Sequence, residues 1–181
     1  RVLVTAGGTR EPMDPVRYIA NRSSGKMGYA LAGTAACMGA EVTLVSGPTS
    51  LDRPGGLEVV EVETAEELWR EVMAREAECD VVVMAAAVAD FTPAKRSAEK
   101  IKKEKREGLT LQLAPTRDVL KELGERKRQG QVLVGFAAET GNLKERASGK
   151  LRAKGADLIV ANDISTPGSG FASDNNKAVL V

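Results

Sequence analysis

The chain has 181 residues, an apolar fraction of 43% and a formal net charge of +1. This length suits one compact domain that buries enough apolar surface to fold without disulfides or metal clips, and the apolar fraction argues against disorder. The small net charge argues against a general nucleic-acid-binding surface, so any anion site must be local. Histidine is absent, which excludes Ser/His/Asp triads, Cys/His pairs and HExxH zinc sites.

The cysteines and the hydropathy pattern bear on the cellular compartment. Cys37 and Cys79 stand apart without CxxC spacing, so we interpret them as reduced core thiols. No run approaches the roughly 18 apolar residues that a membrane helix needs, and Arg1 leads into a strand pattern rather than a signal peptide. We therefore expect a cytoplasmic protein with neither membrane nor nucleic-acid partners.

The first elements alternate between strand and helix. The opening residues predict a buried strand that ends in a tight turn at Gly7 and Gly8. Small and apolar residues at helical spacing predict a helix from Gly25 to Met38, which Gly39 ends. Residues 40–48 then supply the next strand.

The same unit repeats and is then interrupted. We predict a strand over residues 57–64, a helix from Ala65 to Glu78 with Thr64 as its N-cap, and a fully apolar strand over residues 80–90. Residues 92–108 form a dense run of basic and acidic side chains, which predicts a mobile or partly helical basic segment.

Alternation resumes in the second half of the chain. The predicted elements are a strand over 109–113, a helix from Arg117 to Arg128, a strand over 131–140, a helix from Leu143 to Lys154 ended by Gly155, and a strand over 156–163. The last 18 residues predict a loop that enters a final strand. Because that strand resembles half a hairpin without a partner, we expect the domain to be truncated at its C-terminus.

The alternation predicts an α/β fold: a single domain over residues 1–181 with a Rossmann-like, mostly parallel sheet and helices on both faces. Polar loops follow four of the strands, and their sequences are TAGGTREPMD, VSGPTS, AAAVADF and GFAAET. The carboxyl ends of parallel strands meet at one edge of a sheet, so these loops should line a common cleft.

One loop, YIANRSSGKMGYALA, places polar side chains directly before a helix. Ser23, Ser24 and Gly25 could hold phosphate, because the first amides of a helix lack internal partners and the helix dipole favours anions there. The alternative is a plain N-cap serine. The loop is not a P-loop, since Met follows the Gly-Lys pair, and the glycines elsewhere do not match a dinucleotide fingerprint.

Single polar residues have both functional and ordinary interpretations. The Asn21 amide could hold a carboxylate or mixed anhydride, or it could simply form a turn. Lys100 lies in a charge run that could equally be a solvated face. Lys150 and Lys154 are one helical turn apart near a helix end, where cations also complement the dipole. Asp90 follows alanines small enough for a planar base to lie against them.

Five blocks of the chain together resemble one enzyme family. They are TAGGTREPMDPVRYIANRSSGKMG, AAAVADF, EKIKK, GFAAET and ANDIS with GFASDNN, in the order found in phosphopantothenoylcysteine synthetases. The resemblance implies a ligase that joins 4'-phosphopantothenate to L-cysteine in coenzyme A biosynthesis. The carboxylate attacks the α-phosphate of CTP with Mg²⁺ present, pyrophosphate leaves, and the cysteine amine then displaces CMP from the acyl-cytidylate.

The resemblance also implies residue roles. Asn21 matches the family asparagine that engages the acyl intermediate, and Lys100 matches a lysine that covers the triphosphate. The implied nucleotide-binding residues are Met84, Ala85, Ala86, Asp90, Lys100, Arg117, Asp118, Val119, Leu120, Phe136, Lys150 and Lys154. Arg117 to Leu120 depart from the proline-containing loop of the family. Ser23, Ser24 and Gly25 would face phosphate, and Mg²⁺ would bind mainly through the nucleotide phosphates.

The family is dimeric, with neighbouring subunits contributing to each other's sites, and its bacterial members commonly carry a flavin-dependent decarboxylase domain in the same protein. A homodimer is therefore expected. Two other classes remain open from the residues alone: an NAD(P)-binding oxidoreductase, which the strand and helix alternation would suit, and a non-catalytic nucleotide-binding module. The choice between CTP and ATP is likewise not decided by any single residue.

Overall fold

The computed structural model describes residues 1–103, 108–139, 141–163 and 175–181. Its main element is a seven-stranded sheet with the order β11-β10-β9-β6-β1-β4-β5. The strands are β1 Val2–Ala6, β4 Val42–Ser46, β5 Glu58–Glu61, β6 Val81–Met84, β9 Val132–Glu139, β10 Leu158–Asp163 and β11 Ala178–Leu180. Every neighbouring pair is parallel except β10 and β11, which confirms the predicted mostly parallel sheet.

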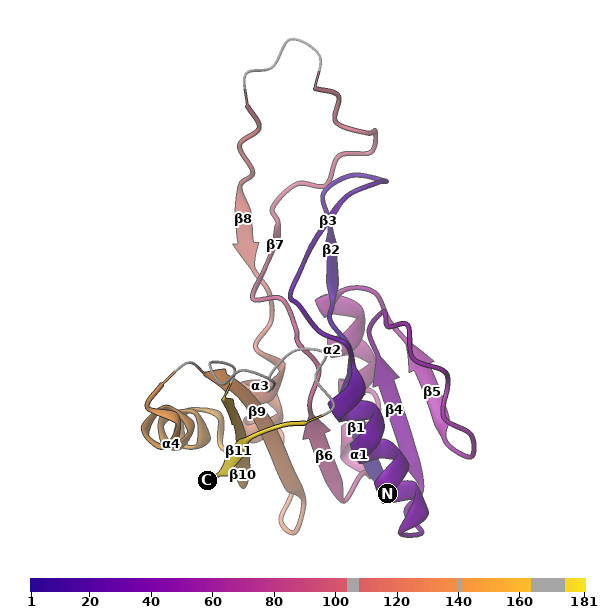
Figure 1. The fold of residues 1–181 in the computed structure, drawn as a ribbon, viewed down its shortest axis with the longest axis vertical. Helices are drawn as coiled ribbons and strands as arrows, with labels where there is room; N and C mark the ends of the chain where they lie inside the picture. Colours follow the sequence, from indigo (N-terminus) through magenta and orange to yellow (C-terminus); the bar gives the residue numbers. More distant parts are fainter. Residues whose placement is uncertain (104–107, 140, 164–174) are drawn as a thin grey trace.

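Helices cover both faces of this sheet, as predicted (Figure 1). They are α1 Lys26–Cys37, α2 Ala65–Met73, α3 Val119–Arg126 and α4 Leu143–Lys154. Alternation along β1 separates two cores: Leu3 packs in the cluster that contains Leu68 of α2, whereas Val4 and Ala6 pack with Ala32 of α1. Side chains of successive strand residues point to opposite faces, so β1 carries both layers.

Two short antiparallel ribbons stand away from the sheet (Figure 1). One pairs β2 Arg10–Pro12 with β3 Tyr18–Ala20, and the other pairs β7 Phe91–Pro93 with β8 Leu113–Pro115. The sequence patterns did not predict the first ribbon, although the Asp-Pro pair in its loop is a turn signal. They placed the β8 strand a few residues too early, at 109–113.

The described part of the basic segment contains a short strand and no helix, so its predicted partly helical character is not found there. Residues 104–107 lie outside the described residues. Whether the segment is mobile therefore stays a prediction.

Three other expectations are corrected. The helix predicted from Ala65 to Glu78 ends at Met73, and a separate 3₁₀ turn, η1, covers Glu76–Glu78. The final strand does have a partner, because β11 pairs antiparallel with β10. Cys37 is exposed rather than in the core, because the buried positions of α1 are Gly28 and Ala32. Thr64, as predicted, caps α2 in a capping box with Glu67.

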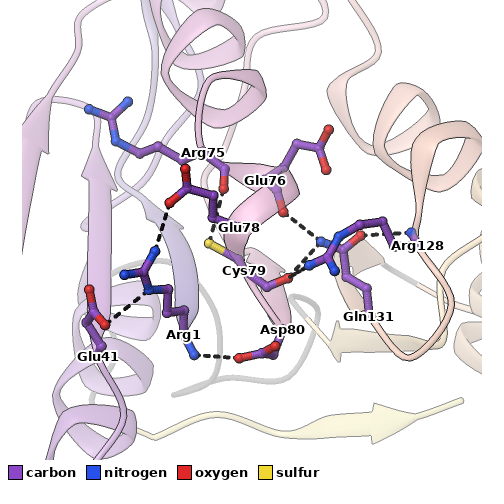
Figure 2. Close-up of polar contacts among 9 residues, drawn as sticks. All are labelled: Arg1, Glu41, Arg75, Glu76, Glu78, Cys79, Asp80, Arg128 and Gln131. Atoms are coloured by element: carbon purple, nitrogen blue, oxygen red, sulfur yellow. Dashed lines mark hydrogen bonds and ion pairs between the residues drawn. The ribbon is translucent and has the colours of Figure 1, made fainter.

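The amino ends of the strands are closed by polar contacts (Figure 2). Buried Gln131 donates from Nε2 to the carbonyls of Glu76 at 2.7 Å and Cys79 at 2.9 Å, and Arg128 donates to the same Cys79 carbonyl. These bonds hold the chain at both ends of η1, where it turns to enter β6. Burial raises the pKa of the Cys79 thiol.

The length and apolar character of the helices bear on whether any of them could cross a membrane. Among the residues that the structure describes, none of the helices combines the length and apolar character needed to cross a bilayer.

Candidate active site

A cleft of about 1090 Å³ lies at the carboxyl edge of the sheet. Its walls come from the loop before α1, the loop after β6, the end of β9 and the amino end of α3. Ligand pockets usually measure about 300–1,000 Å³, so this cleft has room for more than one small molecule. The four polar loops do meet at one sheet edge, but only two of them line the cleft as predicted, those after β6 and at the end of β9, whereas residues 5–14 and 45–50 do not line it.

Glycines let the loops at this edge come together. Gly7 has a φ of 75°, and a Cβ added there would lie 2.6 Å from the carbonyl oxygen of Gly47. A Cβ on Gly47 would in turn lie 2.8 Å from the oxygen of Gly8. Any side chain would separate the loops that follow β1 and β4.

Three threonine hydroxyls shape the alanine-rich loop after β6. Thr5 Oγ1 accepts the Ala86 N–H at 3.1 Å, and Thr9 Oγ1 accepts the Ala89 N–H at 2.9 Å. Both threonines are fully buried. Thr116 Oγ1 donates to the Ala89 carbonyl at 2.6 Å. The Thr5 and Thr9 hydroxyls take the N–H groups of Ala86 and Ala89, and beyond Met84 the pairing with the chain after β1 continues as an isolated bridge between Gly8 and Ala87, so the strand predicted over residues 80–90 ends at Met84.

Asn21 lies on the cleft wall, directly after β3. Its Nδ2 donates to the Val88 carbonyl at 2.9 Å. This bond fixes the orientation of the Asn21 side-chain amide, with its NH₂ group pointing to the loop after β6. An amide held in this way can bind a carboxyl or acyl oxygen without exchanging protons with it.

The loop before α1 is also ordered by its own hydroxyls. Gly25 is the N-cap residue, with a φ of 79° and no side-chain cap bond. Ser23 Oγ accepts the Gly25 N–H at 3.3 Å, and Thr49 donates to the Ser24 carbonyl at 2.8 Å. The plain N-cap serine interpretation is therefore wrong, and the amino end of α1 faces the cleft with its positive dipole end.

The opposite wall carries a charged pair. Asp118 caps α3 by accepting the Lys121 N–H at 3.1 Å and also pairs with Lys154 of α4. Burial raises the pKa of Asp118, but the bonds from Lys154 and the Lys121 N–H, with the charge of Lys150, outweigh it and leave the pKa below its ordinary value. Lys150 Nζ donates to the Phe136 carbonyl at 2.6 Å, at the cleft surface.

Close packing of α3 on α4 keeps this pair together. A Cβ on Gly124 would lie 1.8 Å from the carbonyl oxygen of Lys154. The two helices thus touch through backbone atoms, and no larger residue fits at this position.

Most of the residues singled out from the sequence line the cleft. They are Asn21, Ser23, Ser24, Gly25, Met84, Ala85, Ala86, Asp90, Asp118, Val119, Leu120, Phe136 and Lys150. Six polar lining residues had been given no role: Arg22, Lys26, Tyr29, Asp52, Asn162 and Asn176. All but Asp52 lie in sequence stretches that had been singled out, so the stretches were found but not the individual side chains.

Three of the singled-out residues do not line the cleft. Arg117 stacks on Trp69, with its guanidinium carbon 4.0 Å from the ring centroid, and pairs with Glu66. Lys154 reaches the cleft only through Asp118. Lys100 is exposed on the segment beside the turn between β2 and β3.

Within the described part of the chain, no three His, Cys, Asp or Glu groups gather closely enough to form a metal site. Carboxylates do line the cleft singly, at Asp52, Asp90 and Asp118. Such a wall suits a hard cation that is held mainly by oxygens of a bound ligand, as Mg²⁺ commonly is.

The fold and the cleft define a Rossmann-like α/β protein with an anion-compatible ligand site at the carboxyl edge of its sheet. A profile of the family described as DNA/pantothenate metabolism flavoprotein C-terminal domain matches residues 1–181. The chain belongs to this family.

Known relatives agree with that assignment. The coenzyme A biosynthesis bifunctional protein CoaBC of Bacillus subtilis (strain 168) is 52% identical over 176 residues, which are 97% of this chain and 43% of that protein. A cysteine/cysteine sulfinic acid decarboxylase from an unknown prokaryotic organism is 48% identical over 183 residues, which cover 100% of this chain and 50% of that protein. The chain thus spans about half the length of these relatives.

A solved structure has the same fold. The crystal structure of the C-terminal domain of a bifunctional CoaBC protein superimposes with a TM-score of 0.82 at 45% identity, covering 99% of this chain and 81% of that one.

Proposed function

We propose that this chain is a phosphopantothenate-cysteine ligase that activates 4'-phosphopantothenate with CTP and joins it to L-cysteine in coenzyme A biosynthesis. The observation that carries the proposal is the single cleft that brings together Asn21, the amino end of α1 and the alanine loop after β6. The relatives' names support the pathway.

The chemistry suits a protein without histidine. A carboxylate is already ionised at neutral pH, so it needs no base to attack the α-phosphate of CTP. A new bond forms between the carboxylate oxygen and the α-phosphorus while the bond to pyrophosphate breaks. The cysteine amine then attacks the acyl carbon, CMP leaves, and the ammonium proton passes to the medium. The protein's main task is to align the reactants and offset phosphate charge.

Each wall of the cleft has a part in this proposal. The Asn21 amide holds the acyl oxygen of the intermediate, and its bond to Val88 sets its direction. The backbone of the alanine loop and Asp90 hold the cytidine. Ser23, Ser24 and the amino end of α1 face phosphate groups, and Lys150 adds positive charge beside Phe136.

Mg²⁺ belongs to the proposal as a companion of CTP. The separate carboxylates on the cleft wall fit a cation that arrives on the triphosphate. When bound, Mg²⁺ would neutralise phosphate charge, and Asp52 and Asp90 on the cleft wall are candidate oxygen ligands from the protein.

We further propose that the protein acts as a homodimer. Lys100 lies outside the cleft of its own chain, on the segment beside the two ribbons, where Val16 and Tyr18 of one ribbon and Phe91 of the other are exposed. Pairing of two copies through these apolar residues would cover them and bring Lys100 toward a partner's triphosphate. The full-length protein would also contain a decarboxylase domain, which the bifunctional and decarboxylase names of its relatives support. Its unpaired cysteines suit the cytoplasm.

Pyrophosphate release tests the proposal. The protein is incubated with Mg²⁺, 4'-phosphopantothenate and each of CTP, ATP, GTP and UTP, with and without L-cysteine. Release should require phosphopantothenate and be fastest with CTP, and an acyl-cytidylate should accumulate when cysteine is omitted. Equal rates with the four nucleotides would overturn the choice of CTP. Product without an acylated nucleotide would overturn the mechanism.

A further inference from the structure

The turn between β2 and β3 is built around one buried carboxylate. Asp14 is 2% exposed. Its Oδ1 accepts the N–H groups of Val16 at 2.8 Å and Arg17 at 2.9 Å, which makes a tight Asx-type turn. Its Oδ2 accepts Arg17 Nε at 2.9 Å, and the two side chains form an ion pair.

The same pair of side chains binds the backbone of the basic segment. Asp14 Oδ2 accepts the Ile101 N–H at 3.0 Å, and Arg17 Nη2 donates to the Ile101 carbonyl at 2.6 Å. Both polar backbone atoms of one residue are thus held by one ion pair. A third bond, from the Ser97 N–H to the Met13 carbonyl at 2.9 Å, fixes the segment a short distance upstream.

These contacts are more than a local turn needs. An Asx turn satisfies its own N–H groups without reaching a segment that is distant in sequence. Ile101 is half-buried, whereas its neighbour Lys100 is exposed. Holding the Ile101 backbone leaves the Lys100 side chain free to extend while fixing the position of its Cα.

We propose that Asp14 and Arg17 are positioning residues that hold Ile101 by both backbone atoms and so place Lys100 for its work on the nucleotide. The inference rests on the proposed function of Lys100.

The experiment combines exchange and kinetics on the whole chain. The variants are Asp14→Asn, Arg17→Lys, Lys100→Ala and the double variant Asp14→Asn with Lys100→Ala. Arg75→Lys is the matched control, because Arg75 also donates to a carboxylate and a backbone carbonyl, both of Glu71 on α2. We call the hold of Asp14 and Arg17 on the Ile101 backbone the clamp. The rate of hydrogen exchange at the Ile101 amide measures whether the clamp is intact, and the kcat of CTP-dependent pyrophosphate release measures whether it contributes to activity.

Asp14→Asn and Arg17→Lys should each speed Ile101 exchange and lower kcat by about ten-fold or more, since small misplacements of a reacting group are costly. Arg75→Lys should change neither quantity. In the Lys100→Ala background, Asp14→Asn should cause no further loss, because it acts through Lys100. Arg17→Lys keeps the positive charge, so it can be used for both measurements if Asp14→Asn does not fold.

Two results would overturn the inference: unchanged Ile101 exchange in both single variants, or losses that multiply fully in the double variant. Failure of the proposed function looks different. If the unaltered protein released no pyrophosphate, or if Lys100→Ala left kcat unchanged, the role of Lys100 would be wrong, while the exchange measurement would still decide whether the clamp exists.

Discussion

The two edges of the central sheet are built in opposite ways. At the amino edge, side-chain contacts close the surface: the Arg1 guanidinium bonds to Glu41 and Glu78, Gln131 bonds to two backbone carbonyls, and no comparable cleft opens there among the described residues (Figure 2). At the carboxyl edge, buried hydroxyls such as that of Thr9 hold the backbone of loops, and the loop after β6 lines a cleft. The first arrangement closes a surface, and the second keeps one open. Changes at the amino edge should therefore affect stability alone, whereas changes at the carboxyl edge should affect activity.

The largest effect should come from Asn21→Asp. The new carboxylate would face the Val88 carbonyl oxygen without a proton to donate, where the amide now donates at 2.9 Å. Loss of an oriented donor to a reacting group typically costs about 100-fold to 1,000-fold in kcat. We expect at least that loss of product with the thermal unfolding curve retained. Asn142→Asp, at the amino end of α4 and away from the cleft, is the control, and unchanged turnover would remove Asn21 from the mechanism.

Two glycines of α1 should respond in opposite directions to the same change. A Cβ on Gly28 would lie 2.5 Å from the Ala6 Cβ, whereas a Cβ on Gly33 would have no atom within 4 Å. Gly28→Ala should therefore lower the free energy of unfolding by about 1–3 kcal/mol through overpacking. Gly33→Ala should raise it by about 0.5–1 kcal/mol through helix propensity. Urea unfolding measures both, and a loss of equal size in the two variants would contradict the packing argument.

At the amino edge, Gln131→Leu should lower stability without lowering activity. It removes the amide that bonds the carbonyls of Glu76 and Cys79, each of which keeps one other donor. A hydrogen bond contributes about 0.5–1.5 kcal/mol, so the loss of two should lower the free energy of unfolding by about 1–3 kcal/mol. The exposed neighbour Gln129, changed to Leu, is the control. If kcat for pyrophosphate release fell with stability in Gln131→Leu, the separation between the two edges would be wrong.

The smallest effect concerns the pH dependence of the Asp118 and Lys154 pair. The pKa of Asp118 is lowered from its ordinary value of 3.8, so its stabilisation is present above that pH and is lost as pH falls through the lowered value. Asp118→Asn keeps the N-cap and removes the charge. Because the pair is partly exposed, we expect a loss below about 1 kcal/mol at neutral pH, shrinking as the pH is lowered. A loss that grew in acid would contradict the assignment.

Strong local patterns predicted much of the fold. The capping box at Thr64, the glycine that ends α4 and the apolar runs of β1 and β6 each act within a few residues of chain. The limits of β6 could not be predicted in this way, because residues 85–89 continue the apolar run of the strand. Hydroxyls of Thr5 and Thr9, distant in sequence, decide that the loop leaves the sheet.

The features of the candidate site can likewise be divided into those that local sequence predicts and those that depend on contacts between distant residues. Sequence by itself determined which polar loops meet at the carboxyl edge, because parallel strands bring their ends together whatever the details of packing. Only the tertiary structure decided that Asn21 is turned by Val88, that Lys100 lies outside its own cleft and that Asp14 and Arg17 hold Ile101. The physical reason is the separation of the interacting residues along the sequence. Periodicity and capping depend on residues that are close in sequence, whereas these contacts join atoms that only the completed fold brings within hydrogen-bonding distance.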